Sequence, residues 1–566
     1  MGIIQSIEAN CKNCYNCIRH CPVKAIKFQN EQATVLEDEC VLCGSCYLAC
    51  QQKAKQIQSD LDTIKGFIEN RQKVYASIAP SFVSAFPQVS FAQISHAIKR
   101  LGFTSVEETA IGAAKVSAQY GHLIREGHMQ NIITTCCPTI VLLVEKYYPE
   151  LIKYLSPVIS PALAHARMMK NVYGSRIKTV FIGPCFSKKH EAQRSGDINA
   201  TLLFDELRDW LHEAGIEPDE ADPKPSEIRS VINRLYPVPG GVIRTIPSAL
   251  RKTYKCVAVD GLDKCMEVLE SLYDDKLTGF FIEMSACAGS CIGGPALHTF
   301  DTPKLSANNM IIHSAKAKTQ TPAPMSENST VDMHAQYFTQ RITNKVPDEA
   351  TIKAILASIG KISEDKMYNC GACGYKTCRE KAIAVFQGKA DVKMCMPYMR
   401  ERAESMSNMI LDHTPNAIFV LDGEFKIIEF NTAAIKVFHL NDMNYIGMPL
   451  GRLLPNDCLD KVKATGSDIL DHKIHLGQHD RTLEVSILHI EDNDAYIVIA
   501  KDITSEEKQH EELARMRAET LEVAQNVIDK QMRVAQEIAS LLGETTGETK
   551  AALTKLKKTI VQGDLE

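Results

Sequence analysis

The order of apolar and polar residues divides the chain into stretches of different character. Between Val74 and Ile312, short apolar runs alternate with segments of helical periodicity, which is the pattern of an α/β domain. Residues 315–350 are polar and rich in Thr, Pro, Ser and Asn, so we expect a linker there. From 405 to 505, strand-like segments turn at Asp422-Gly423 and again near Asp492–Asp494, which predicts hairpins.

The end of the chain is predicted to be helical. From Ser505 onward, apolar residues recur at steps of three, four and seven positions, which places them on one face of a helix, and Gly543 is the expected stop. The members of this apolar face are Val523, Val527, Val534, Ile538 and Leu541.

Composition and charge exclude several classes of protein. With 45% apolar and 23% charged residues, the chain is globular in character, and its 566 residues suffice for several domains of about 150 residues. The 64 Lys and Arg against 69 Asp and Glu give a net charge of −5, so no nucleic-acid partner is indicated. The sequence has no evident signal peptide and no apolar run of about 18 residues, so we expect a cytoplasmic protein without a membrane span.

Cysteine is the unusual component, with 20 residues against a single Trp. In a reducing compartment, clustered cysteines are metal ligands or catalytic groups more often than disulfides. The first 60 residues contain a C-x2-C-x2-C-x3-C run twice. Three thiolates of such a run reach one 4Fe–4S cubane and the fourth reaches the neighbouring cluster, whereas a zinc ribbon, the alternative, rarely shows this tandem spacing. The pattern assigns one cluster to Cys11, Cys14, Cys17 and Cys50 and the other to Cys21, Cys40, Cys43 and Cys46.

The N-terminal segment resembles bacterial two-cluster ferredoxins, which implies that it carries electrons. A second group of four thiols suits a third 4Fe–4S cluster, with zinc as the alternative. This group consists of Cys370, Cys373, Cys378 and Cys395. It resembles the four-cysteine iron–sulfur domains attached to several anaerobic redox proteins, and its place in the chain suits electron transfer between the central and C-terminal regions.

Three apolar runs of the central region each lead directly to cysteine. The first leads to Cys136 and Cys137, the second to Cys185, and the third to Cys287, with Cys291 four residues further on. Helical periodicity follows at least the first two, and strand, cysteine and helix in repetition gather the thiols at the carboxyl ends of a parallel sheet. Helix N-termini there favour anionic thiolates. Spacing alone therefore predicts a further 4Fe–4S site from Cys137, Cys185, Cys287 and Cys291.

The three loops read TTCCP, GPCFSKKHE and EMSACAGSCIGG, and they resemble the signature loops of FeFe-hydrogenases, which hold the hydrogen-activating H-cluster. The resemblance covers about residues 1–312. It implies that the four thiolates bind the cubane of the H-cluster. It also implies that Cys291 bridges to a diiron subcluster that carries CO, cyanide and an azadithiolate.

The resemblance also implies roles for other residues. The diiron subcluster is expected near Pro184 and Lys188, with the ammonium donating to a cyanide, which electrostatics also favours. Cys136 corresponds to the proton-relay cysteine of the family, and simple packing is the alternative for this thiol.

Several residues depart from the pattern of catalytic members. Met is usual where this chain has Gly183 and Ser285, Trp is usual at Ile140, and Pro-Gly-Gly is usual at Ala288-Gly289-Ser290. We count Ser285 with Cys136, Pro184 and Lys188 among the catalytic positions. The changed surroundings are expected to shift the potential and ligand stability of the cluster.

The proton path departs as well. Carboxylates are usual 20 and 17 residues ahead of the relay cysteine, where this chain has Val116 and Gln119. Of the matching path only the hydroxyl of Ser156 is present. Fast turnover needs a relay of matched pKa leading to water, so we expect slow catalysis or an alternative path.

Residues 405–505 resemble a PAS domain, and the chain as a whole resembles the sensory, PAS-containing branch of FeFe-hydrogenases. PAS domains dimerise or transmit signals, and some bind haem or flavin. His439 or His413 would be the haem ligand, although a lone histidine is more often a surface or core residue. Asp502-Ile503-Thr504 leads into the predicted helix, as in signalling helices that follow PAS domains. Cys256, Cys265 and Cys458 lack ligand spacing and are expected to be structural.

The predicted architecture is a multidomain α/β and α+β protein. Its expected segments are a two-cluster ferredoxin module (1–60), an α/β H-cluster domain (61–313), a linker (314–347), a four-cysteine iron–sulfur module (348–400), a PAS domain (405–505) and a C-terminal signalling helix (506–566).

Three functions fit these features. The first is a hydrogen sensor that reacts with H2 slowly and signals to a partner such as a kinase or phosphatase, because no kinase or phosphatase block follows the PAS region. The second is a working hydrogenase that exchanges protons and electrons with H2 and with ferredoxin or a bifurcating complex. The third is a non-enzymatic electron carrier without the diiron site. A homodimer through the PAS domain and the final helix is expected.

Overall fold

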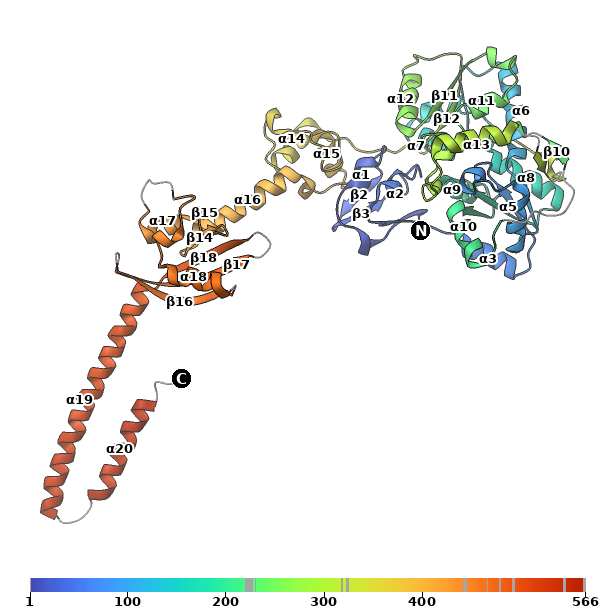
Figure 1. Cartoon of the computed structure of the whole chain (residues 1–566). Helices are drawn as coiled ribbons and strands as arrows, with labels where there is room; N and C mark the ends of the chain where they lie inside the picture. The colour runs from blue at the N-terminus through green and yellow to red at the C-terminus, as the bar shows by residue number, and fades with distance from the viewer. Residues whose placement is uncertain are drawn as a thin grey trace. The chain divides into compact units, whose positions relative to one another are not determined.

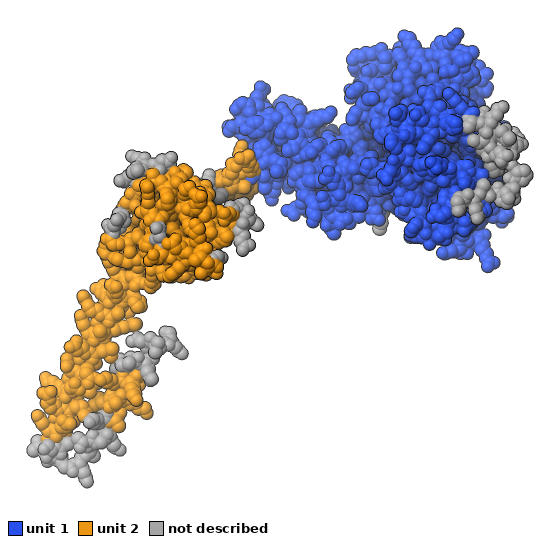
Figure 2. Space-filling view, viewed as in Figure 1, with its two compact units in different colours: residues 1–399 blue, residues 400–566 orange. Residues whose placement is uncertain are grey.

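The computed structural model describes residues 2–218, 227–229, 231–316, 319–321, 325–440, 445–465, 467–477, 480–490, 494–542 and 546–562. The chain divides into two compact units, residues 1–399 and 400–566 (Figure 2). Among the described residues, no helix is both long enough and apolar enough to cross a membrane.

The N-terminal module consists of two antiparallel strand pairs and two short helices. β1 (Ile4–Ser6) pairs with β4 (Lys55–Ile57), and β2 (Ile26–Gln29) pairs with β3 (Gln32–Val35). The helices are α1 (Asn16–His20) and α2 (Ser45–Ala49). Each helix contains the third cysteine of one run and ends at the fourth, so the sequence repeat is also a structural repeat.

The central domain contains two parallel sheets (Figure 1). The sequence analysis expected a single parallel sheet with the thiols at the carboxyl ends of its strands. The first sheet has the order β6-β5-β8-β9 and the second the order β11-β12-β7. Apolar runs mark strands but do not specify which strands pair. The first sheet packs in one apolar core, and the second sheet lies between that core and a second one, with Ile132 in the first core and Ile133 in the second. The strands are β5 (Val74–Ile78), β6 (Ser105–Glu108), β7 (Ile132–Ile133), β8 (Lys178–Gly183), β9 (Ala200–Leu203), β11 (Lys255–Asp260) and β12 (Phe280–Ser285).

Helices connect and cover these strands, as expected for an α/β domain. They are α3 (Leu61–Glu69), α4 (Phe82–Ala85), α5 (Phe91–Arg100), α6 (Ala110–Glu126), α7 (Pro138–Tyr147), α8 (Pro161–Tyr173), α9 (Ser187–Ser195), α10 (Phe204–Glu213), α11 (Gly241–Thr245), α12 (Leu262–Tyr273) and α13 (Lys304–Lys316). The backbones of α6 and α8 approach closely at Gly112, where a Cβ would lie 2.2 Å from the Pro161 carbonyl oxygen.

The segment predicted as a linker makes specific contacts with the central domain. β13 (Thr319–Thr321) pairs with β10 (Glu227–Arg229). Further on, the backbone N–H of Ile159 donates to the Met333 carbonyl at 3.0 Å, and that of Gln340 donates to the Glu145 carbonyl at 2.9 Å. Residues 333–342 therefore run along the central domain as a strap.

The four-cysteine module contains α14 (Glu349–Ala357) and α15 (Cys378–Phe386), and it packs against the N-terminal module. The backbone N–H of Phe28 donates to the Lys389 carbonyl at 2.8 Å, and the ammonium of Lys24 donates to the Gly374 carbonyl at 2.8 Å. Modules that are more than 300 residues apart in the sequence thus share one interface. Directly after Cys395 begins the long helix α16 (Met396–His413).

The second unit is built on an antiparallel sheet with the order β15-β14-β18-β17-β16. The expected turn at Asp422 joins β14 to β15. The second expected hairpin is β17–β18, and residues 491–493 of its turn lie outside the described residues. Buried and half-buried side chains alternate along β14, as in a sheet with one covered face. The elements are β14 (Ala417–Leu421), β15 (Ile427–Phe430), α17 (Thr432–Phe438), α18 (Asn456–Thr465), β16 (Ile469–Leu476), β17 (Arg481–Ile490) and β18 (Ala495–Asp502).

The predicted C-terminal helix is α19 (Thr504–Leu542), and it is followed by α20 (Thr546–Gln562), which the periodicity did not indicate. The expected stop, Gly543, lies outside the described residues.

Candidate functional site

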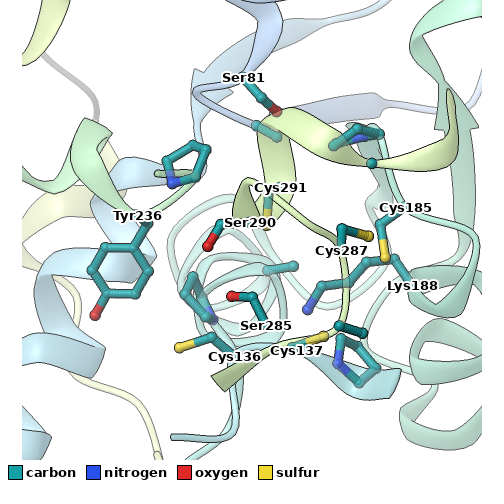
Figure 3. Close-up of a pocket in the computed structure, with 18 of the residues that line it drawn as sticks. Ser81, Cys136, Cys137, Cys185, Lys188, Tyr236, Ser285, Cys287, Ser290 and Cys291 are labelled. Atoms are coloured by element: carbon teal, nitrogen blue, oxygen red, sulfur yellow. The ribbon is translucent and has the colours of Figure 1, made fainter. Parts of the chain in front are cut away.

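A pocket of the central domain lies where strands of both sheets end (Figure 3). β7 leads to Cys136 and Cys137, β8 leads to Cys185, and β12 ends just before Cys287. All of these residues line the pocket, as does Cys291. Two sheets rather than one thus direct their carboxyl ends to a single cavity, which is where α/β folds place ligand sites.

The four thiols predicted to hold the cubane lie close enough to repel one another as thiolates. Burial raises the pKa of Cys287 well above its usual value, and the nearby Cys185, Cys137 and Cys291 raise it further. Burial also raises the pKa of Cys137, and backbone N–H groups of Ala286 and of the start of α7 partly oppose that shift. Four thiolates that line one cavity need a cationic centre between them, so this donor set fits an iron–sulfur cluster.

Cys136 and Lys188 line the same pocket. The Sγ atom of Cys136 lies 3.2 Å from the Tyr120 hydroxyl, and burial raises the pKa of Cys136 to about 12, so this side chain is a neutral thiol near pH 7. The Lys188 ammonium donates to the Ser160 hydroxyl at 2.8 Å and to the Glu191 carboxylate at 2.6 Å. An ammonium has three N–H groups, so one is left to face the pocket. Figure 3 shows Lys188 reaching in among the thiols.

Pro184 and Ser285 also line the pocket, together with Ser81, which the sequence analysis did not identify. Ser81 is completely buried, and its hydroxyl has no hydrogen-bond partner among the described residues. Leaving a buried hydroxyl unpaired costs about 1–3 kcal/mol, so Ser81 fits a bound group that accepts a hydrogen bond, such as a cyanide ligand. Its sequence signal is the same as for the cysteines, because it follows the buried strand β5.

The residues at the departures from the hydrogenase pattern are well accommodated. A Cβ at Gly183 would lie 2.6 Å from the Phe181 ring, so the ring occupies the space into which a larger residue at 183 would extend. Ile140 is completely buried in the core around the second sheet. In the third loop, the Gly289 N–H donates to the Asp260 carboxylate at 2.6 Å, which fixes the turn before Cys291.

The residues that replace the usual proton path do not form one. Val116 is completely buried in the apolar core, and Gln119 is half-buried on the same helix, α6. Ser156 is buried, its hydroxyl has no partner among the described residues, and it is not part of the described pocket lining. The structure thus leaves Ser156 isolated from Cys136.

The N-terminal module brings its cysteines together across the two runs. Cys11, Cys14 and Cys17 line one cavity with Cys50 of the second run. In the second set, burial raises the pKa of Cys21 to about 12, and the thiols of Cys43 and Cys40 raise it further, so these groups are neighbours. The pKa of Cys46 is raised well above its usual value by burial and by the thiols of Cys43, Cys40 and Cys21. The sequence assigns these two groups to two clusters, and their binding of clusters stays a prediction.

The four-cysteine module surrounds a small cavity with Cys370, Cys373, Cys378 and Cys395. Desolvation lowers the pKa of the nearby Lys381 ammonium, and three of these thiols act against that shift. Among the described residues, no three His, Cys, Asp or Glu side chains are placed to hold a single metal ion.

The three remaining cysteines and the two histidines are not among the residues that line these cavities, although Cys265 lies close behind the wall of the central pocket. Cys265 is buried, and its thiol lies 3.5 Å from the Ser285 carbonyl oxygen. Cys458 is buried in the PAS core, and Cys256 is half-buried. His439 and His413 are both exposed. His439 contacts Arg481 at 3.3 Å, and His413 contacts the Met409 carbonyl at 3.0 Å.

The cysteine sets adjoin one another. Cys43 of the second set lines the central pocket, and its thiol is near enough to Cys287 to raise the pKa of that residue. On the other side, the pKa of Tyr375 is raised by burial and by the thiols of Cys373 and Cys21, so this ring lies beside both modules. The order in space is therefore central pocket, N-terminal module, four-cysteine module.

Comparisons with known families agree with this arrangement. Residues 72–295 match the family described as iron only hydrogenase large subunit, C-terminal domain, and residues 3–51 match a 4Fe-4S dicluster domain. Residues 367–397 match an Fe-S cluster family, and residues 405–471 match a PAS domain.

Relatives of known name are distant. Iron hydrogenase 1 of Clostridium pasteurianum is 26% identical over 42% of this chain and 52% of its own length. The periplasmic Fe hydrogenase large subunit of Nitratidesulfovibrio vulgaris is 28% identical over 52% of this chain and 86% of its own length. The cytosolic Fe-S cluster assembly factor NAR1 of Yarrowia lipolytica is 26% identical over 29% of this chain and 38% of its own length. The solved structure of FeFe-hydrogenase HydA1 from Chlamydomonas reinhardtii covers 50% of this chain and 100% of its own at 17% identity, with a TM-score of 0.40.

The chain is therefore a hydrogenase-like iron–sulfur protein. It joins an iron-only hydrogenase large-subunit domain to 4Fe–4S domains and a PAS domain, which is the architecture expected from the sequence.

Proposed function

We propose that this protein reacts reversibly with H2 at a low rate and reports the outcome through its PAS domain. The observation that carries the proposal is the convergence of Cys137, Cys185, Cys287 and Cys291 on one pocket that also holds Cys136 and Lys188. When bound there, an H-cluster supplies the redox chemistry that interconverts H2 with two protons and two electrons.

The side chains of this pocket have distinct tasks. The thiolates of Cys137, Cys185, Cys287 and Cys291 would hold the cubane of an H-cluster. Lys188 and Ser81 donate hydrogen bonds toward cyanide ligands, and the neutral thiol of Cys136 exchanges protons with the reacting centre. A low rate follows from the isolated Ser156 and from the absence of carboxylates at 116 and 119.

A sensory role is supported by the path from the pocket to the PAS domain. The cysteine sets adjoin in order, with Cys43 at the pocket and Cys373 on the far side, which suits 4Fe–4S clusters that pass electrons along the chain. Helix α16 starts directly after Cys395, and the carbonyl of Leu411 in its last turn accepts a hydrogen bond from Asn431 of the PAS domain at 2.8 Å. A redox change at the four-cysteine module thus has a continuous helix through which to act.

Infrared spectroscopy of the matured protein, together with the rate of H2 turnover, tests the proposal. CO and cyanide bands that change when argon is replaced by H2, with turnover well below that of catalytic hydrogenases, are the expected result. Bands that do not respond to H2 contradict it.

A second candidate is an iron–sulfur protein without the diiron site. It is favoured by the match to NAR1 proteins, which are named as assembly factors rather than hydrogenases. The absence of CO and cyanide bands after maturation, with the 4Fe–4S clusters present, would support this alternative. A fast hydrogenase that feeds ferredoxin or a larger complex is the third, and rapid turnover would identify it.

A further inference from the structure

A second cavity lies next to the central pocket. Its volume is about 220 Å3, and its wall includes Thr135, His190, Glu191, His334 and Tyr337. Unlike the central pocket, it has no cysteine in its lining. His334 is exposed on the strap, so the cavity has a side that reaches the surface.

The cavity wall is connected to Cys136 by hydroxyl groups. Tyr120 is completely buried, and its hydroxyl lies 3.2 Å from the Cys136 sulfur and 3.5 Å from the Thr135 hydroxyl. The backbone N–H of Thr135 donates to the Tyr120 oxygen at 3.1 Å, which fixes the phenol between the two. The ring also packs edge-to-face on Phe281.

Thr135 contacts Tyr120 and also lines the second cavity. Its hydroxyl donates to the Val158 carbonyl at 2.7 Å, and the Tyr337 hydroxyl donates to the same carbonyl at 3.1 Å from the strap. Rotation of the Thr135 hydroxyl turns its hydrogen from this carbonyl toward the cavity. A space of this size, with His190 and Glu191 in its wall, has room for water with several partners.

We propose that the second cavity is the proton exit of the hydrogenase domain, reached from Cys136 through the hydroxyls of Tyr120 and Thr135. The inference rests on the proposed function, since it takes Cys136 as the proton-exchanging thiol. For each proton released by H2 oxidation, Cys136 gives its hydrogen to Tyr120 and regains one from the reacting centre. Tyr120 gives its own hydrogen to Thr135, and Thr135 gives its own to water in the cavity, which carries the proton to the surface. Each hydroxyl keeps its neutral form, and the electrons leave separately through the iron–sulfur clusters.

The position of Tyr120 explains how the chain manages without the usual path. Tyr120 lies on α6, one residue after Gln119, so the helix that lacks the carboxylates presents a phenol to the thiol. A second hydroxyl network on the same helix joins Ser117 to Tyr236 at 2.8 Å and to Thr245 at 2.7 Å. Tyr236 also lines the central pocket, but among the described residues this second network has no hydrogen bond to Cys136. Tyr236→Phe is therefore a matched control for the loss of a phenol hydroxyl near the thiol.

The test measures proton exchange directly. The full-length, cluster-loaded protein is transferred into D2O without H2, and the S–H stretching band of Cys136, identified by subtraction of the Cys136→Ala spectrum, is followed as it converts to S–D. Tyr120→Phe keeps the ring but removes the hydroxyl, so we expect exchange about ten-fold slower or more. Tyr236→Phe removes a hydroxyl of the other network and is expected to exchange at the wild-type rate.

Thr135→Val provides an independent variant, since it removes the next hydroxyl while preserving shape, and it should slow exchange as well. CO and cyanide bands unchanged from wild type show that the pocket is intact in each variant. Exchange at the wild-type rate in Tyr120→Phe, or equal slowing in Tyr236→Phe, overturns the proposal. If the wild-type protein does not react with H2 but its S–H exchange still depends on Tyr120, the proposed function fails while the proton exit stands.

Discussion

At the scale of single residues, Cys136 is the group on which the chemistry depends most. Its thiol is neutral and buried beside the four thiols that are expected to hold iron. We expect Cys136→Ala to lower H2 evolution by about 100-fold or more, because the variant loses the proton donor but no proposed iron ligand. Infrared bands of CO and cyanide should persist, and Cys256→Ala, which removes a half-buried thiol outside the pocket, should retain activity. Full activity in Cys136→Ala would refute the relay role.

Gly183 and Phe181 form a pair whose sizes are matched. A Met at 183 would meet the Phe181 ring, and overpacking of this kind costs about 1–3 kcal/mol. We therefore expect Gly183→Met to lower the thermal unfolding midpoint and the yield of cluster-loaded protein. Phe181→Ala should relieve the clash, so the double variant is expected to be more stable than Gly183→Met alone. Equal loss in the single and double variants would show that the two side chains do not compete for space.

Burial raises the pKa of the Glu283 carboxyl from 4.5 to about 7. Hydrogen bonds from backbone N–H groups at the start of α11 oppose this shift but do not cancel it. The folded protein therefore binds this proton more tightly than the unfolded chain does. The contribution of Glu283 to the free energy of unfolding is therefore fully present below pH 4.5. Up to about 3 kcal/mol of it is lost as the pH rises from 4.5 through 7. A carboxylic-acid carbonyl band that disappears near pH 7 in the infrared spectrum, and is absent from Glu283→Gln, is the expected observation. A band that is already lost at pH 5 contradicts the assignment.

At the scale of elements, α19 carries an apolar face for which the chain provides little cover. Val523, Val527, Val534 and Ile538 are between 43% and 62% exposed, and their spacing matches one face of a coiled coil. We expect this face to pair with a second copy of the chain. Val527→Lys should weaken the dimer by about ten-fold or more in dissociation constant, measured by sedimentation. Gln525→Lys adds the same charge on the opposite face and should leave the dimer intact, and a wild-type chain that sediments as a monomer would refute the pairing.

The elements also show what sequence patterns can and cannot supply. The strands that end at Cys137, Cys185 and Cys287 were predictable, because a buried strand followed by a cysteine is a local signal. Their distribution over two sheets was not, because pairing depends on which faces become buried together. The contact of Tyr120 with Cys136 and the unpaired hydroxyl of Ser81 belong to the same category, since both arise from packing between distant segments.

At the scale of the whole molecule, the order of modules follows from cysteine spacing, whereas their contacts do not. Nothing in the spacing indicates that Lys24 binds the Gly374 carbonyl or that the four-cysteine module packs on the N-terminal one. The contacts of the strap could not be predicted either. Its polar composition predicted a linker, and it did not indicate that Gln340 and Phe338 bind Glu145. Electron flow and signalling depend on these contacts, and for this reason the sensory role needed the structure as well as the motifs.

The sensory role makes its own demand on the whole molecule, because a signal must pass from the pocket to the PAS domain through the four-cysteine module. Hydrogen–deuterium exchange of the last turn of α16 is expected to change when the cluster-loaded protein is placed under H2, since that turn ends on Asn431. Cys378→Ala removes one expected ligand of the third cluster and should abolish this change, while the infrared response of the pocket to H2 persists. Cys256→Ala, which alters a half-buried thiol outside every set, should behave as wild type. An H2-dependent exchange change that survives in Cys378→Ala would show that the signal bypasses this module, and the strap, which binds Glu145 of the central domain, would then be the route to examine.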